Sequence, residues 1–218
     1  MKKRILLINT KAYIQVTGKR LERLTQASGS LSGKAEIIFA VQPSDIPLAS
    51  RHVTTFAQHV DAIEPGKHTG RILPESVKQA GAKGILINHY ERRLPIRDIK
   101  ANIERARRLG LRSIVCVSRN SLVRQIAPLG PDYIAFEAPE LIGTGISVSR
   151  VEPEVIRRFV RLVKKANPRV GVLCGAGVSS TEDVSNALEL GTDGVLLASA
   201  VPKARDPEKK VKELLRGF

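Results

Sequence analysis

The chain has 218 residues, 42% of them hydrophobic, which is enough for a core in one large domain or two small ones. Lys and Arg number 36 against 21 Asp and Glu, so the net charge is +15. This composition excludes a disordered or collagen-like chain, and no apolar run approaches the ~20 residues of a bilayer-spanning helix. The apolar run 5–8 stops at Asn9, too early for a signal peptide, so we expect a cytoplasmic protein.

Short apolar, β-branched runs bounded by Gly, Pro or polar residues alternate with amphipathic stretches along the chain. The runs predict strands at 4–9, 36–41, 53–59, 84–88, 112–117, 132–136, 170–174 and 193–197. The stretches predict helices at 17–27, 44–51, 74–82, 96–109, 121–127, 153–166, 181–190 and 206–216, with the fewest helix signals in 44–51.

Repeated strand-then-helix order implies parallel strands joined by right-handed crossovers. The sequence therefore predicts the α/β fold class, as a closed (β/α)₈ barrel with residues 1–218 in a single domain. A doubly wound open sheet is the alternative. It would carry a glycine-rich fingerprint after its first strand, where this chain has Asn9, Thr10 and Lys11.

The two cysteines and the positive charge admit simple explanations. Cys116 and Cys174 lie in apolar runs with no ligand partner at metal-binding spacing, so we expect buried free thiols and no metal.

The positive charge would suit RNA or another polyanion, but Lys and Arg are scattered along predicted helices without interleaved aromatic residues. Solvated helix faces are the preferred interpretation, and polyanion binding is a minor alternative.

In a (β/α)₈ barrel the chemistry lies at the carboxyl ends of the strands. Lys11 follows the first predicted strand, His89 the fourth and Glu137 the sixth. A carboxylate, an imidazole and an ammonium at one end of a barrel suit proton abstraction next to a carbonyl, as base, polariser and cation. Loops of small residues at 143–145, 175–177 and 198–199 would let backbone N–H groups approach a phosphate.

Several segments together carry a family resemblance. They are residues 9–11, 57–59, 66–70, 88–93, 137–145, 174–179 and 196–199. In these segments, and from the first strand to the last helix, the chain resembles triosephosphate isomerase in its short archaeal form. The stretch 137–145 is the most specific of them, because it resembles a combination of base and mobile lid that is particular to this family.

The resemblance implies isomerisation of dihydroxyacetone phosphate and D-glyceraldehyde 3-phosphate through an enediolate, in glycolysis and gluconeogenesis, with no cofactor. Glu137 would be the base and His89 the neutral electrophile. Lys11 would supply positive charge and Asn9 a hydrogen bond, with Glu91 paired to Lys11. The phosphate would bind backbone N–H groups near Ile142, Gly143, Gly177, Ala198 and Ser199.

The resemblance also implies a lid at 138–145 that closes over the substrate, and a homodimer or homotetramer with Thr69 near the subunit interface. The chain departs from the family in four places: Tyr90 replaces Ser, Ala138 replaces Pro, Thr10 replaces an aromatic residue and Ala200 replaces Gly. We expect Tyr90 to rearrange the site or to lose a contact that holds the catalytic carboxylate. The alternative function is therefore a diverged barrel with weak activity or another phosphorylated substrate.

Overall fold

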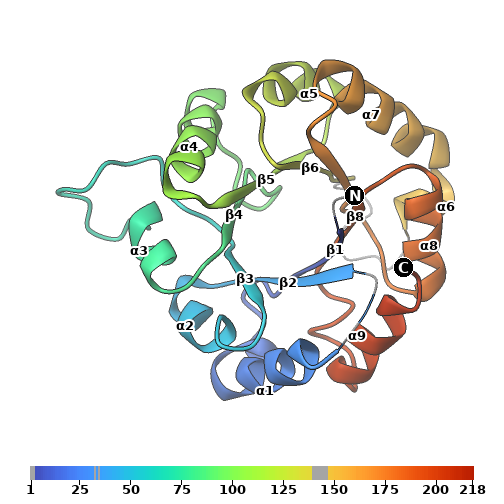
Figure 1. Ribbon diagram of the computed structural model, residues 1–218, viewed down its shortest axis with the longest axis horizontal. Coiled ribbons are helices and arrows are strands. Elements are labelled where there is room, and N and C mark those ends of the chain that lie inside the picture. The colour runs from blue at the N-terminus through green and yellow to red at the C-terminus, as the bar shows by residue number, and fades with distance from the viewer. Residues whose placement is uncertain (1–2, 32, 34, 139–146) are drawn as a thin grey trace.

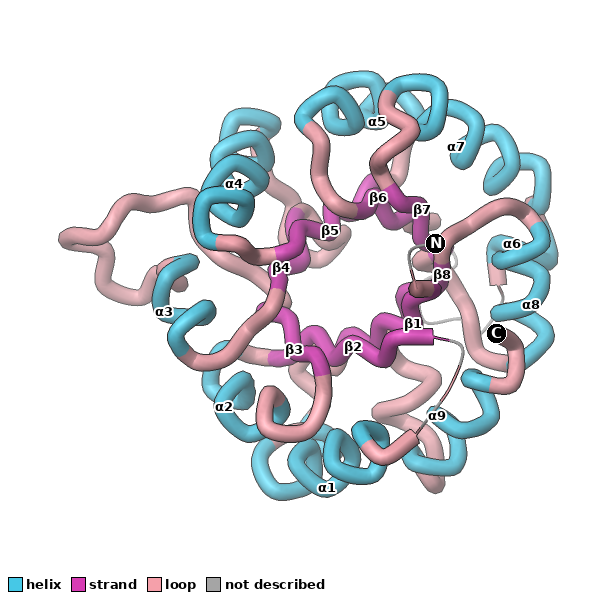
Figure 2. The backbone as a smooth tube through the Cα atoms, viewed as in Figure 1, coloured by secondary structure: helices cyan, strands magenta, loops and turns pink. Residues whose placement is uncertain are grey.

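The computed structural model describes residues 3–31, 33, 35–138 and 147–218, and its strands form a closed parallel barrel ringed by helices (Figures 1 and 2). β1 (Arg4–Asn9) pairs with both β2 (Ala35–Val41) and β8 (Gly194–Leu197), which closes the sheet. Between them, in chain order, lie β3 (Thr54–Ala57), β4 (Gly84–Ile87), β5 (Arg112–Val117), β6 (Tyr133–Phe136) and β7 (Gly171–Cys174). The barrel confirms the predicted fold class.

Helices follow the strands and cover the outside of the barrel (Figure 2). They are α1 (Gly18–Gly29), α2 (Ile46–Ala49), α3 (Pro74–Gln79), α4 (Ile96–Leu109), α5 (Asn120–Ile126), α6 (Val148–Val151), α7 (Pro153–Ala166), α8 (Thr181–Glu189) and α9 (Pro207–Leu215). The helix expected at 44–51 is a single turn preceded by a 3₁₀ turn at Pro43–Asp45. α6 was not predicted, because a one-turn helix is too short to show helical periodicity.

Alternation along each strand divides the apolar side chains between two cores. On β1, Ile5 and Leu7 belong to one cluster, while Leu6 and Ile8 belong to the other, larger one. The first cluster fills the barrel and includes Ile38, Phe56, Ile114, Tyr133 and Leu173 from other strands. The second joins the outward strand faces to the buried faces of the helices, among them Ile103 of α4 and Phe159 of α7.

Two glycines let large rings enter the barrel. A Cβ on Gly84 would overlap the ring of Phe56, and a Cβ on Gly171 would overlap the ring of Tyr133. Both glycines start their strands, so the rings occupy space at the amino end of the barrel. This end is therefore filled by packing, and the open chemistry is left to the opposite end.

The loop between β3 and α3 projects from the barrel (Figure 2). Its base is held by Asp61, which accepts hydrogen bonds from the backbone N–H of Ile72 at 2.8 Å and from Arg71 at 2.9 Å. Arg105 of α4 also forms ion pairs with Glu64 of the loop and Glu75 of α3. None of the described helices is long and apolar enough to span a bilayer.

Candidate active site

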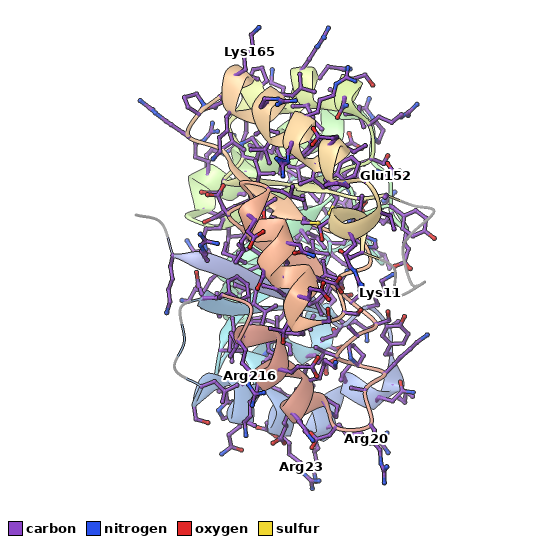
Figure 3. The ribbon with its side chains drawn as sticks, turned by 90° about the vertical axis from the view of Figure 1, so that its right-hand side faces the viewer. Lys11, Arg20, Arg23, Glu152, Lys165 and Arg216 are labelled. Carbon is purple, nitrogen blue, oxygen red and sulfur yellow. The ribbon has the colours of Figure 1, made fainter. Side chains whose placement is uncertain are left out.

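Three predicted site residues lie just beyond the carboxyl ends of their strands. Lys11 follows β1 by two residues, His89 follows β4 by two, and Glu137 follows β6 directly. All strands are parallel, so the three residues meet at one end, which we call the barrel mouth. Figure 3 shows Lys11 on the same side of the molecule as Glu152, which precedes α7.

Strained backbone occurs at two positions of the mouth, one of them directly before His89. Lys11 and Asn88 have φ of 47° and 62°, a left-handed region that non-glycine residues seldom adopt. The turn at Lys11 is held by its own N–H, which donates to Oδ1 of Asn9 at 3.0 Å. Asn88 accepts from the N–H of Leu94 at 2.9 Å and donates to the carbonyl of Cys116 at 2.8 Å. The sequence pattern predicted no role for Asn88, although the residue belongs to the segment 88–93 that carries the family resemblance.

A backbone hydrogen bond fixes the tautomer of His89. The N–H of Glu91 donates to Nδ1 at 3.2 Å, so Nδ1 is an acceptor and the neutral ring carries its proton on Nε2. Burial lowers the pKa of His89 to about 4, helped by the positive charge of Lys11. At neutral pH the ring is therefore uncharged and offers Nε2–H toward Glu137, whose Oε1 lies 3.3 Å away.

Glu137 is a carboxyl group with 0% exposure. Its Oε2 accepts from the backbone N–H of Tyr90 at 3.0 Å, whereas Oε1 has no hydrogen-bond partner in the described part of the chain. Burial raises the pKa of Glu137 to about 7. The Cys116 thiol donates a hydrogen bond to this carboxylate and, with the charge of Arg93, opposes that rise. A free oxygen on a carboxyl group with this pKa suits a general base.

Cys116 and Cys174 are buried and free, as predicted. Nothing in the sequence predicted that Cys116 contacts Glu137. Its position in β5 does place it on the same strand face as Ile114, which lies inside the barrel. Strand alternation therefore predicts that the Cys116 side chain faces the inside of the barrel. Its contact with Glu137 depends in addition on the stagger between β5 and β6.

Lys11 is held on both sides. Its Nζ lies 2.8 Å from Oε1 of Glu91, and its carbonyl accepts from Nε2 of Gln58 at 2.9 Å. Gln58 also donates to Thr10 at 3.1 Å and to the carbonyl of Ala40 at 3.2 Å. Gln58 thus joins the ends of the first three strands. The sequence pattern did not predict this role, although Gln58 belongs to the segment 57–59 that carries the family resemblance.

A cleft with a volume of about 1060 Å³ opens at the mouth. Lys11 and His89 line it together with Gly177, Ala198 and Ser199, three of the predicted phosphate-binding residues. Gly177 has φ of 70°, a conformation that glycine adopts without strain. The other two predicted phosphate-binding residues, Ile142 and Gly143, lie outside the described residues, as does the predicted lid apart from Ala138.

The structure shows how the residues that depart from the family pattern are placed. Tyr90 is 39% exposed, and its backbone N–H, not a side-chain hydroxyl, contacts Glu137. A carboxylate contact is therefore kept with a larger side chain. Thr10 is buried and donates its hydroxyl to the carbonyl of Ala40 at 3.2 Å. Ala200 has no positive φ, so alanine causes no strain there. Ala138 is buried immediately before the undescribed segment.

Comparison with known proteins settles the family. The family model for triosephosphate isomerase matches residues 4–215. The chain belongs to the triosephosphate isomerase family. A triosephosphate isomerase of Methanoculleus marisnigri is 46% identical over 214 residues, covering 96% of each chain. That of Methanocaldococcus jannaschii is 45% identical over 216 residues, covering 97% of this chain and 99% of the relative.

A third triosephosphate isomerase, from Archaeoglobus fulgidus, is 45% identical over 215 residues, covering 97% of this chain and 96% of the relative. All three source organisms are archaea, in agreement with the short archaeal form that the sequence resembles. Membership of the triosephosphate isomerase family rests on the whole barrel, because the match begins in β1 and ends in α9. The site geometry is an independent observation that bears on activity.

Proposed function

We propose that this chain is a triosephosphate isomerase that interconverts dihydroxyacetone phosphate and D-glyceraldehyde 3-phosphate, with Glu137 as the base. One observation carries the proposal: the fully buried carboxyl group of Glu137 has a free Oε1 that lies 3.3 Å from Nε2 of His89. His89 is fixed as a neutral donor by the N–H of Glu91. Base and electrophile therefore stand side by side before substrate binds.

The reaction begins with proton transfer. Glu137 takes a proton from C1 of dihydroxyacetone phosphate, and the electrons of the C–H bond form a C1–C2 double bond while the carbonyl electrons move to O2. Nε2–H of His89 and the ammonium of Lys11 stabilise the negative oxygen. Protonated Glu137 then returns the proton to C2, and the hydroxyl proton passes from O1 to O2. No atom is gained or lost, as an isomerisation requires.

Supporting residues keep these groups in place. Glu91 holds Nζ of Lys11 at 2.8 Å and, through its backbone, the ring of His89. Asn9 uses Oδ1 to hold the backbone of Lys11, and its Nδ2, which makes no hydrogen bond within the described ranges, is left for a substrate oxygen. Backbone N–H groups at Gly177, Ala198 and Ser199, with Ile142 and Gly143 from the lid, would bind the phosphate.

We also propose a homodimer or homotetramer. Thr69 is exposed on the projecting loop between β3 and α3, and Ile14, just after β1, is 70% exposed. An exposed large apolar side chain beside a site and a projecting loop are features that an interface between subunits would cover. A cytoplasmic location and one domain over residues 1–218 complete the proposal.

The test is a coupled isomerase assay with D-glyceraldehyde 3-phosphate on the wild type, Glu137→Gln and Glu189→Gln. Glu189 is an exposed residue at the end of α8, so its variant matches the chemical change far from the site. We expect Glu137→Gln to lower kcat by about 10³-fold or more and Glu189→Gln to leave it unchanged. Equal activity in wild type and Glu137→Gln would contradict the proposal and point to contamination or to a diverged barrel.

A further inference from the structure

The cleft at the barrel mouth is longer than the proposed substrate requires. Beyond Gly177 and Ser199 its lining continues to residues 203–210 at the start of α9. The proposed contacts of a three-carbon monophosphate, at Lys11, His89 and Ser199, do not include the part of the cleft that residues 203–210 line, which we call the outer part. Small-molecule sites usually enclose most of their ligand, so the outer part has room for a second group on a longer ligand.

Lys203 lies in the outer part of the cleft, close to the proposed phosphate loop. Its backbone N–H donates to the carbonyl of Ser199 at 3.0 Å, so it lies one turn beyond the proposed phosphate loop. Its Nζ lies 5.2 Å from the centre of the Tyr13 ring, which comes from the loop after β1. Both residues line the cleft. The ring attracts the ammonium and therefore holds this charge over the seam between β1 and β8.

Two cations in the outer part of the cleft have no carboxylate partner among the described residues. Lys203 and Arg205 form no ion pair with any carboxylate in the described part of the chain. Asp206 accepts from the backbone N–H of Lys209 at 2.9 Å and so caps α9. Glu213 pairs with Lys210 at 2.8 Å, which leaves Glu208 as the remaining lining carboxylate. Two unpaired cations beside a proposed phosphate loop favour a further anion.

We propose that Lys203, held by Tyr13, and Arg205 form a second anion subsite. The cleft then binds acyclic anions that carry a phosphate at each end. One phosphate occupies the loops at Gly177 and Ser199, and the second group contacts the side chains of Lys203 and Arg205. Such anions compete with the triose phosphate. The location of the first phosphate rests on the proposed function.

The test measures binding directly, by calorimetry with inorganic phosphate and inorganic tripolyphosphate at constant ionic strength. The proteins are the wild type, Lys203→Met, Arg205→Met and Lys165→Met. Figure 3 shows Lys165 at the opposite end of α7 from Glu152 and far from Lys11, so its variant removes the same charge away from the cleft. Exposed substitutions of this kind rarely disturb folding.

In the wild type we expect one tripolyphosphate per chain, bound about tenfold more tightly than phosphate and displaced by phosphate. Lys203→Met and Arg205→Met should each reduce that ratio to about threefold or less, and Lys165→Met should leave it unchanged. Tyr13→Phe should keep the ratio, and Tyr13→Leu should lower it, because only the ring attracts Lys203.

Equal affinities for the two anions in the wild type, or an equal loss in Lys165→Met, would overturn the second subsite. Calorimetry needs no turnover, so the result is independent of isomerase activity. If tripolyphosphate fails to bind while Glu137→Gln abolishes isomerisation, the subsite is wrong and the proposed function stands. If tripolyphosphate binds as expected but no isomerisation is found, the second subsite stands and the proposed function is wrong.

Discussion

The buried carboxyl group of Glu137 should reduce the stability of the protein at neutral and higher pH. Its pKa is raised from 4.5 to about 7 by burial, so the folded state holds a proton that the unfolded state releases. Stability from this group is fully present below 4.5 and is lost as the pH rises toward 7. The difference between the two pKa values corresponds to about 3 kcal/mol. Glu137→Gln, which is neutral throughout, should not show this loss.

The assay is urea denaturation of wild type, Glu137→Gln and Glu189→Gln at pH 4.5 and pH 8, at one protein concentration. We expect the stability of Glu137→Gln relative to wild type to increase by about 2 to 3 kcal/mol between the two pH values. Groups that titrate in both proteins cancel in this comparison. Glu189→Gln should show no such increase. A pH-independent difference for Glu137→Gln would refute the raised pKa and with it the argument that burial prepares this base.

Further substitutions test the arrangement around the base. Tyr90→Ser should change kcat/KM by less than about threefold, since the backbone N–H makes the contact with Glu137; a tenfold gain in coupled assays would contradict this. Asn88→Ala should lower the free energy of unfolding by about 2 to 4 kcal/mol and lower kcat, because two side-chain hydrogen bonds hold Asn88 at a φ of 62°. An unchanged urea denaturation curve would contradict this prediction. Gly171→Ala should lower the free energy of unfolding by about 2 kcal/mol or more, and with it the thermal midpoint, because the new Cβ overlaps the ring of Tyr133. An unaltered midpoint in calorimetry would contradict this packing.

Much of the fold followed from local pattern. The strands are short and parallel, so their apolar runs stand out between Gly, Pro and polar residues, and the order of strands and helices leaves few topologies. The helix predicted at 44–51 is only the four-residue α2 in the structure, because a short connection joins β2 to β3. α6 was not predicted, because its four residues show no helical periodicity.

Some residues of the site could be predicted from the sequence and others could not. Lys11, His89 and Glu137 were found because position after a strand identifies the barrel mouth. Asn88, Gln58 and the contact between Cys116 and Glu137 were not, because they depend on distances between segments that only the closed barrel brings together. The consequence of Tyr90 also needed the structure. From sequence, a backbone N–H and a side-chain hydroxyl that serve the same carboxylate cannot be distinguished.

The most direct test of Glu137 as the shuttling base is isomerisation of D-glyceraldehyde 3-phosphate in D₂O, with the product analysed by NMR. The proton that Glu137 removes either exchanges with solvent or returns to the substrate, so we predict deuterium at C1 in part of the dihydroxyacetone phosphate from the wild type and almost no product from Glu137→Gln. Product formed by Glu137→Gln as fast as by the wild type, with or without deuterium, would contradict Glu137 as the base.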